Sequence, residues 1–293
     1  GQLSISSRDC PLQYVLDRNP PAEKTGADPF RNLQWHLDNT GALESFSGMK
    51  AGEDLRVVPV WNAGINGFGV RVAVVDDGML LMHEDLRANV VPGSHNYDPK
   101  GHPDYPVPCS TLESHGTEVA GVIAARNGNG VGLSGVAPHA SLVGLNPAVT
   151  GQDSDTLNAL TRDLDSNDIF NNSWGNEDSG HFYGYQNAAG FRAALNEGLE
   201  KGRKGRGSIY VFAGGNGALN GDYSVLDGYV AERGVVTVCA SNAAGVRAFY
   251  SERGPNLTVC APSAGASDEA ELPSIATTTT GYEDAKEGKK ETD

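Results

Sequence analysis

The sequence predicts an α/β protein with a doubly wound parallel sheet and helices on both of its faces. Six short segments are expected to be strands, at 70–75, 141–145, 168–172, 208–213, 235–240 and 257–261. Four segments are expected to be helices, at 57–63, 115–125, 154–164 and 188–201. Strands that alternate with helices indicate a parallel sheet, and the site of such a sheet lies at the carboxyl ends of its strands.

The first strand and the helix that follows it carry the strongest local signals. The continuous apolar run at 70–75 is typical of a strand buried on both faces. The helix at 115–125 begins at His115 and carries Val119, Val122 and Ile123 as an apolar stripe. Its remaining residues are mostly small, so we expect this helix to pack close to its neighbours.

The next two helices are amphipathic. We expect Ser154 or Asp155 to cap the helix at 154–164. The predicted apolar faces consist of Leu157, Leu160 and Leu164 in this helix and of Phe191, Leu195 and Leu199 in the helix at 188–201.

The composition is that of a globular protein with an acidic surface. Hydrophobic residues make up 39% of the 293 residues, and the formal net charge is −15. This charge argues against nucleic acid as a partner. It is compatible with a cationic substrate, although a solvated acidic surface is the more common reason for it. No apolar run reaches the roughly 18 residues of a membrane span, so we expect no membrane partner.

The chain divides by composition into three parts. Residues 1–27 are expected to form an irregular arm, 28–280 the main α/β domain, and 281–293 a charged tail. Within the main domain, residues 79–112 are expected to be mostly loop because they contain five prolines, at 92, 99, 103, 106 and 108.

Four cysteines are present, at spacings that do not suit zinc. Cys239 and Cys260 both end strand-like runs and could be adjacent, which would leave Cys10 to pair with Cys109. Buried free thiols are the alternative. If the bridges form, the compartment is oxidising, and we expect a secreted or extracytoplasmic protein.

A carboxylate at a strand end and a histidine at a helix start are two parts of a nucleophilic triad. Asp76 would accept a hydrogen bond from one ring nitrogen of His115 and so fix its tautomer. The other ring nitrogen would take a proton from a serine hydroxyl. His115 alone would more often be structural; the upstream carboxylate favours a catalytic role.

Four motifs together resemble the subtilisin superfamily, and specifically its kexin/furin branch of proprotein convertases. They are VAVVDDGMLLMHEDL, SHGTEVAGVIAA, NNSWGNEDSG and FAGGNG. The order of acid and then histidine is that of the subtilisins. The resemblance extends from about residue 28 to 280 and implies a subtilisin-like fold and a serine endopeptidase.

The resemblance implies a role for each matching residue. Asp76 and His115 match the acid and base, and Asn216 matches the amide that donates to the oxyanion. Asp77 matches the group that faces a basic residue at P2. The implied substrate-binding residues are Ser173, Trp174 and Gly175 along the peptide, with Asp178 and Asp227 as the two carboxylates of the S1 pocket.

Two carboxylates in one narrow pocket suit a guanidinium, which presents a planar fork of donors. We therefore expect cleavage after Arg, with Lys weaker. The alternative interpretations are that Asp178 and Asp227 are surface acids and that Asn216 belongs to a Gly-Asn-Gly turn.

The resemblance also implies two Ca²⁺ sites built from oxygen ligands on distant segments. The first would use Asp178, Asp222 and Glu252, and the second would use Asp28, Asp85 and Asn129 with backbone carbonyls of Arg126, Val131 and Leu133.

The family's Gly-Thr-Ser nucleophile motif is not found. Ser263, Ser267 and Ser274 lack its sequence context. We expect the chain to be one part of an enzyme and nearly inert by itself. The alternatives are a non-catalytic module that binds basic peptides and a calcium-stabilised hydrolase without basic selectivity.

The remaining expectations concern selectivity and partners. Leu112 and Gly184 stand where further acids of the S2 and S4 subsites would be, so we expect a dibasic preference without a strict four-residue motif. Expected partners are polypeptide substrates with basic residues, and a chaperone, propeptide or inhibitor over the acidic cleft.

Overall fold

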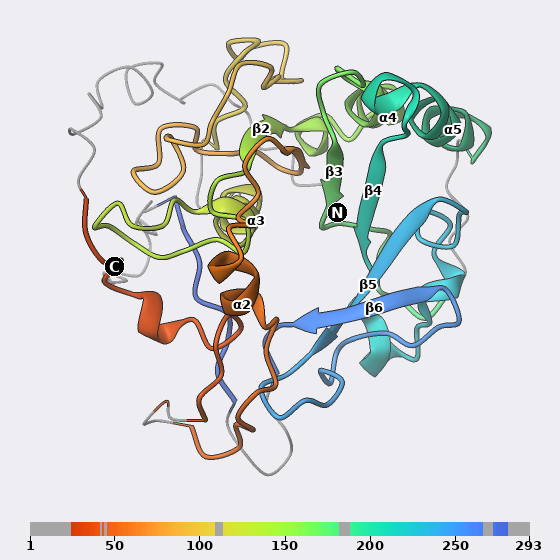
Figure 1. Cartoon of the computed structure of the whole chain (residues 1–293). Coiled ribbons are helices and arrows are strands. Elements are labelled where there is room, and N and C mark those ends of the chain that lie inside the picture. Colours follow the sequence, from red (N-terminus) through yellow and green to blue (C-terminus); the bar gives the residue numbers. More distant parts are fainter. Residues whose placement is uncertain are drawn as a thin grey trace.

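Six parallel strands form one sheet in the order β2-β1-β3-β4-β5-β6 (Figure 1). The computed structural model describes residues 25–41, 43, 46–108, 114–181, 188–265 and 272–280. The strands are β1 (Arg71–Val75), β2 (Ser141–Leu145), β3 (Ile169–Asn172), β4 (Ile209–Ala213), β5 (Val235–Ser241) and β6 (Leu257–Pro262). The predicted parallel sheet is confirmed, and each strand boundary lies within one residue of its prediction.

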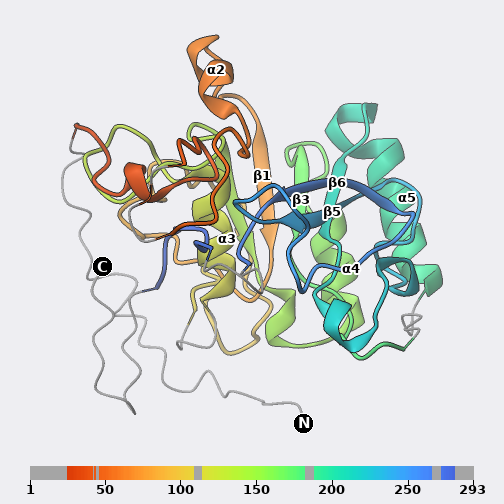
Figure 2. The same ribbon diagram turned by 90° about the horizontal axis from the view of Figure 1, so that it is seen from below.

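Helices cover both faces of the sheet, as predicted. The helices are α2 (Val57–Asn62), α3 (His115–Ala124), α4 (Asp153–Thr161) and α5 (Ala188–Gly205). Short 3₁₀ turns occur at Arg31–Leu33, Pro147–Val149, Gly217–Asn220 and Ser224–Leu226. Figure 2 shows α3 on one side of β1 and the pair α4 and α5 on the other side of the sheet, while α2 projects from the body.

Two hydrophobic clusters separate these layers. The cluster under α4 and α5 contains Phe170, Tyr210 and Phe212 from the middle strands. The cluster under α3 contains Val74 of β1 and Leu142 of β2. Because buried aromatic and branched side chains dominate both clusters, the sheet is anchored from both sides.

The strand order reverses at β1. The chain passes from β1 to β2 on one side, and then through α4 to β3 on the other side of β1. A crevice at the carboxyl edge of such a reversal is the usual site of an open α/β sheet. Asp76 follows β1 and Ser173 follows β3, so both lie at this edge.

The predicted close packing of α3 through its small residues is confirmed. The buried residues of the helix are Gly116, Thr117, Ala120, Gly121 and Ala124, and the half-buried Val119 and Ile123 pack against the same hydrophobic cluster. Small residues let the helix approach its neighbours closely: a Cβ on Gly121 would lie 2.2 Å from Thr278 Oγ1. Close approach decides the orientation of this helix more than hydrophobicity does.

The predicted cap of α4 was wrong. The helix begins at Asp153, so Ser154 and Asp155 lie inside its first turn. Asp155 instead accepts a hydrogen bond from Thr150 Oγ1 at 2.5 Å. The helix ends at Thr161, which leaves Leu164 beyond it.

The predicted bridge between Cys239 and Cys260 is confirmed. The two residues are register partners on β5 and β6. Cys10 and Cys109 lie outside the described residues, as do most of the predicted arm and the whole predicted tail, so these predictions stay open. In the described part of the chain, no helix has the length and apolarity needed to cross a membrane.

Candidate active site

His115 and Asp76 are in contact at the carboxyl edge of the sheet. Nδ1 of His115 lies 2.8 Å from Oδ1 of Asp76. The Asp76 side chain is 5% exposed and the His115 side chain 52% exposed. The hydrogen bond to Asp76 raises the pKa of His115 to about 9, against the opposing effect of burial. The ring is thus held through one nitrogen, while half of its surface stays open.

The turn after β1 brings these groups together. The backbone N–H of Asp77 donates to Asp76 Oδ1 at 2.8 Å. The carboxylate of Asp77 accepts from the backbone N–H groups of His115 and Gly116, at 3.2 and 2.7 Å. Burial, with the neighbouring Asp76 as a lesser cause, raises the pKa of Asp77 to about 6 despite these bonds.

A glycine after the histidine is required by space. A Cβ on Gly116 would lie 2.0 Å from the carbonyl oxygen of Gly78 and 2.9 Å from Cβ of Asp76. The start of α3 therefore rests directly on the turn that carries Asp76.

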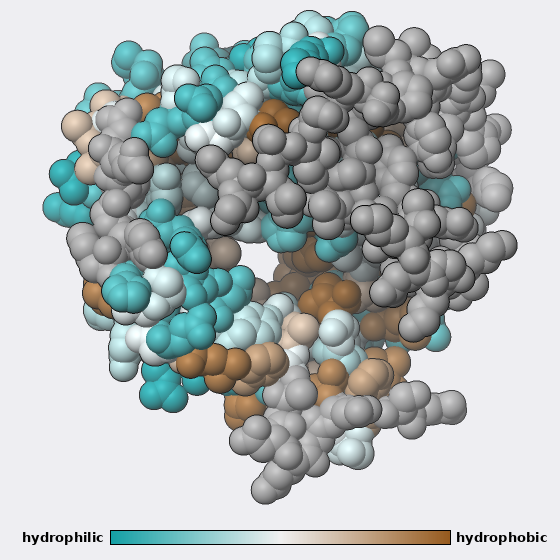
Figure 3. All heavy atoms as spheres, turned by 180° about the vertical axis from the view of Figure 1, so that it is seen from behind, coloured by the Kyte–Doolittle hydropathy of each residue, from teal (hydrophilic) through white to brown (hydrophobic). Residues whose placement is uncertain are grey.

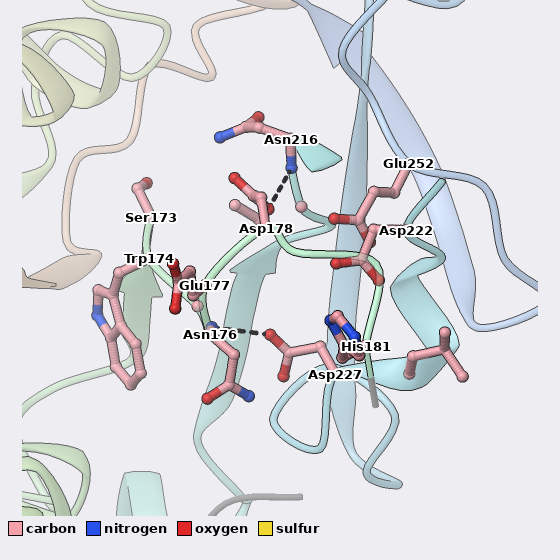
Figure 4. A pocket seen from close by; sticks show the side chains of 14 residues that line it. Ser173, Trp174, Asn176, Glu177, Asp178, His181, Asn216, Asp222, Asp227 and Glu252 are labelled. Atoms are coloured by element: carbon pink, nitrogen blue, oxygen red, sulfur yellow. Dashed lines mark hydrogen bonds between the residues drawn. The ribbon is translucent and has the colours of Figure 1, made fainter. Parts of the chain in front are cut away.

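An acidic pocket opens at the same edge (Figure 4). It is formed by the segment after β3, the turns after β4 and the segment before β6. The sequence-predicted residues among its lining are Ser173, Trp174, Gly175, Asp178, Asn216, Asp222, Asp227 and Glu252. Trp174 links the pocket to the first strand, because its indole Nε1 donates to the carbonyl oxygen of Val75 at 2.8 Å.

Asp227 lies at one end of the pocket. Its Oδ2 accepts from the backbone N–H of Asn176 at 3.0 Å, and its Oδ1 accepts from that of Tyr229 at 2.7 Å. Burial raises the pKa of Asp227 in spite of these hydrogen bonds. A half-buried carboxylate of this kind favours a cationic neighbour.

Three predicted calcium ligands form a cluster beside Asp227. Oxygen atoms of Asp178, Asp222 and Glu252 all lie within 4.8 Å of one another. Glu252 is 3% exposed. Burial is the main cause that raises the pKa of Glu252 to about 7, with contributions from Asp222 and Asp178. Glu252 is buried, Asp222 is half-buried and Asp178 is exposed. Repulsion among the three carboxylates is relieved by a cation, so these residues fit a hard metal ion.

The second predicted set also converges, but its carboxylates hold N–H donors. Asp85 Oδ1 accepts from Asn129 Nδ2 and Asp85 Oδ2 from the Leu133 N–H, both at 2.8 Å. Asp28 Oδ1 accepts from the Gly128 N–H at 2.8 Å. Burial raises the pKa of Asp85 to about 6. The backbone N–H of Arg126 donates to the carbonyl oxygen of Asp85 and that of Val131 to Asn129 Oδ1.

Asn216 lies at the rim of the pocket. It follows β4 and is exposed, and its backbone N–H donates to Asp178 Oδ1 at 3.2 Å. Figure 4 shows its side-chain amide pointing away from Glu252 and Asp222. Within the described part of the chain, that amide has no hydrogen-bond partner, so it is available to an incoming group.

Six residues that line the pocket were not named as site residues from the sequence, namely Asn176, Glu177, His181, Ala213, Gly215 and Leu226. Glu177 stands beside Asp178 in the chain, and this adjacent pair of acids was a usable signal. His181 gave no signal, because only the folded path of the segment after β3 brings it to the pocket.

No described serine hydroxyl hydrogen-bonds to His115. Ser263 instead pairs with the hydroxyl of Tyr250 at 2.7 Å. The carbonyl oxygen of Ser274 accepts from the indole of Trp35 at 3.1 Å. Ser267 lies outside the described residues.

The geometry agrees with what is found in known proteins. A model of the subtilase family matches residues 67–289. This chain belongs to the subtilase family, in its kexin-like branch. Kexin from Saccharomyces cerevisiae is 36% identical over 229 residues, which are 77% of this chain and 26% of kexin. Human proprotein convertase subtilisin/kexin type 7 is 34% identical over 259 residues, 86% of this chain and 31% of that protein.

A similar solved structure is a bacterial subtilase. The crystal structure of the serine protease of Aeromonas sobria has a TM-score of 0.74 and 32% identity, and the match covers 87% of this chain and 46% of that protease. The same protease in complex with the chaperone ORF2 gives a TM-score of 0.75. This subtilase chain thus spans less than a third of the two curated relatives and about half of the solved protease.

Proposed function

We propose that this subtilase is part of a calcium-dependent serine endopeptidase that cleaves after Arg or Lys at dibasic sites. One juxtaposition carries the proposal: the His115–Asp76 pair and a pocket lined by carboxylates share one edge of the sheet. The reaction class is inferred from the family, and the selectivity is inferred from the pocket. We assign residues 28–280 to the catalytic unit.

The chemistry of the pair is general base catalysis. Asp76 fixes the tautomer of His115 and stabilises the imidazolium that forms when the base takes a proton. The amide of Asn216 lies at the rim, where it would donate to the oxyanion of the tetrahedral intermediate. Ser173, Trp174 and Gly175 would hold the substrate backbone.

Selectivity follows from the charge of the pocket. Asp227 and Asp178 would bind the P1 side chain, and Asp77 a basic P2 side chain. A guanidinium makes two parallel bonds to a carboxylate, which a lysine ammonium cannot do, so Arg is favoured over Lys.

The nucleophile must come from a segment outside the described residues. On the face of the sheet opposite α4 and α5, side chains of β4 and β6 are partly uncovered: Ile209 is 38% and Val259 is 54% exposed. Val211 and its register partner Val236 are only half-buried on this face. Figure 3 shows a hollow with hydrophobic surface along one side and mostly hydrophilic surface along the others. We propose that a further helix packs on this face and brings a serine hydroxyl to Nε2 of His115.

Calcium is assigned to the cluster of Asp178, Asp222 and Glu252. The three carboxylates lack a compensating cation among the described residues that line the cluster, and one oxygen of each lies within 4.8 Å of the others, which is compatible with a shared hard cation. When bound, the ion would supply charge compensation beneath the pocket. The set around Asp28, Asp85 and Asn129, with the carbonyls of Arg126, Val131 and Leu133, is the second proposed site.

The test is a substitution in the pocket of the complete protease. Asp227→Asn keeps the size of the side chain and removes its charge. We expect kcat/KM for a Lys-Arg peptide to fall by roughly 10²-fold or more, because a buried charge-assisted pair is lost. A peptide with an apolar P1 residue is the control substrate. If Arg selectivity survives in Asp227→Asn, the S1 assignment is wrong.

A second candidate is a non-catalytic module that binds basic peptides. It is favoured by the absence, among the described residues, of a hydroxyl on the open nitrogen of His115. It predicts tight binding of a Lys-Arg peptide by the 293-residue chain and an intact peptide after prolonged incubation with the protein from its native source. Hydrolysis by the native protein that an active-site serine reagent blocks would exclude it.

Location and partners follow from the same features. The bridge between Cys239 and Cys260 supports an oxidising, extracytoplasmic location. The Aeromonas sobria protease was solved with a chaperone. By analogy, we propose that a chaperone, propeptide or inhibitor covers the acidic cleft before polypeptide substrates do.

A further inference from the structure

We propose that Asp77 is a positioning residue for the catalytic base: its carboxylate caps the helix that carries His115 and so fixes the imidazole in place. This inference rests on the proposed function for the role of His115. It gives Asp77 a task that does not depend on what the substrate carries at P2.

The first turn of α3 leaves donors that need an acceptor outside the helix. The first N–H groups of an α-helix have no intrahelical partner. The side chain of Ser114, at the N-cap position, makes no capping hydrogen bond. Its carbonyl oxygen accepts from the N–H groups of Thr117 and Glu118. The N–H groups of His115 and Gly116 therefore still need an acceptor.

Asp77 satisfies both remaining donors. Its Oδ1 accepts from the N–H of Gly116 at 2.7 Å, and its Oδ2 accepts from the N–H of His115 at 3.2 Å. The cap thus comes from a different element of the fold, the turn after β1. A carboxylate at this position is also favoured by the helix macrodipole.

Two consecutive carboxylates therefore bind the same histidine, one at its ring and the other at its backbone. Asp76 binds the ring through Nδ1, and Asp77 binds the backbone N–H of the same residue. The two are joined, because the N–H of Asp77 donates to Asp76 Oδ1. Removal of the Asp77 carboxylate would free the backbone under the ring while Asp76 stays in place.

Capping and substrate contact are compatible in one carboxylate. Each carboxylate oxygen can accept a second hydrogen bond, so Asp77 can hold the helix and still face a basic P2 residue. The two tasks are separable by substitution. Asp77→Asn keeps an oxygen that can accept from Gly116 but loses the charge, whereas Asp77→Ala loses both.

The first arm of the test is NMR on the 293-residue chain and needs no activity. Amide hydrogen exchange of His115 and Gly116 is expected to be roughly five- to tenfold faster in Asp77→Ala. In Asp77→Asn, the exchange of Gly116 is expected to stay near wild type, because one acceptor oxygen remains. Glu118→Gln is the matched control. It removes another first-turn acid. Among the described residues, the carboxylate of Glu118 accepts a hydrogen bond from the Ser114 hydroxyl alone, at 2.7 Å. Unchanged exchange in Asp77→Ala, or equal acceleration in Glu118→Gln, overturns the proposal.

A measurement on the unmodified chain covers the case in which Asp77→Ala does not fold. An amide proton bonded to a carboxylate shifts when that carboxylate is protonated. The Gly116 amide resonance is therefore expected to move with the titration of Asp77. A Gly116 resonance that does not respond overturns the proposal.

The second arm is kinetics of the complete protease on Lys-Arg and Ala-Arg peptides. Positioning predicts that Asp77→Ala lowers kcat for both peptides by a similar factor, and that Asp77→Asn restores most of kcat. A loss confined to the Lys-Arg peptide and to KM overturns positioning and leaves only the subsite role. If the unmodified protease cleaves neither peptide, the proposed function fails, while the NMR arm still decides on the cap.

Discussion

At the scale of single residues, several titratable groups at the site have pKa values that differ from their ordinary values. The pKa of His115 is raised to about 9 by the hydrogen bond to Asp76. Its folded value therefore lies above that of an unfolded histidine, which is about 6.5. The stabilisation from this contact is fully present below about pH 6.5 and is lost as the pH rises through about 9.

This sign gives a prediction for Asp76→Asn. The substitution should return the pKa of His115 toward its ordinary range, because the largest cause of the raised value is removed. It should lower the free energy of unfolding more at pH 6 than at pH 10. Titration of the His115 ring by NMR and urea unfolding at the two pH values measure these effects. A ring that still titrates near pH 9 in the variant would show that Asp76 is not the cause.

The identity of these residues was predictable, but their second contacts were not. Asp76 and His115 were found from a strand end and a helix start, which are local patterns. The capping of α3 by Asp77 was not found, because the acceptor is far from the helix in the sequence.

At the scale of elements, the pairing of β5 with β6 carries the disulfide. Cys239 and Cys260 are separated by 21 residues. The loop between them contains Glu252, one of the proposed calcium ligands. A bridge that closes a loop of this size restricts the unfolded chain and stabilises the fold by about 3 kcal/mol.

The double variant Cys239→Ser/Cys260→Ser is therefore expected to be less stable by about 3 kcal/mol. Urea unfolding of the variant and of the parent protein measures the difference. The parent treated with a reductant is the control and should behave like the variant. Equal stability of all three samples would mean that the bridge does not stabilise the fold.

The two proposed calcium sites predict that Ca²⁺ stabilises the fold. At a concentration one hundred times the dissociation constant, a bound ion adds about 2.7 kcal/mol to stability. Calcium should therefore raise the melting temperature, and a chelator should reverse the rise. Asp222→Asn and Asp85→Asn each remove a ligand of one proposed site. Calorimetric titration should show about two ions per unmodified chain and one in either variant. An unchanged stoichiometry in Asp222→Asn would remove the cluster from the list of sites.

Helix boundaries were the weakest sequence predictions at this scale. All six strands were predictable because buried parallel strands are short, apolar and bounded by polar residues. The start of α4 was not, because Ser154 and Asp155 are both common capping residues, whereas the helix begins at Asp153 and has Gln152 at its N-cap position.

At the scale of the whole molecule, part of the negative charge is concentrated at the pocket. The net charge is −15, and five carboxylates line the pocket, namely Glu177, Asp178, Asp222, Asp227 and Glu252. Such a concentration of one sign attracts cationic peptides and is screened by salt.

Binding of a Lys-Arg peptide should therefore weaken as salt is added. Between about 0.1 M and 1 M salt the screening length falls from about 10 Å to 3 Å. A peptide with citrulline in place of Arg is the matched control, since it keeps the shape and loses the charge. Fluorescence anisotropy of both peptides over this range measures the effect. A salt-independent affinity for the Lys-Arg peptide would contradict charge attraction as the basis of recognition.

The contact between Gly116 and the carbonyl of Gly78 has a final consequence for this fold. Main chain meets main chain there, with no side chain between them. Backbone packing between the start of α3 and the turn after β1 therefore sets the distance between Asp76 and His115. A larger residue at position 116 would push α3 away from the turn after β1 and would so separate the His115 ring from the Asp76 carboxylate.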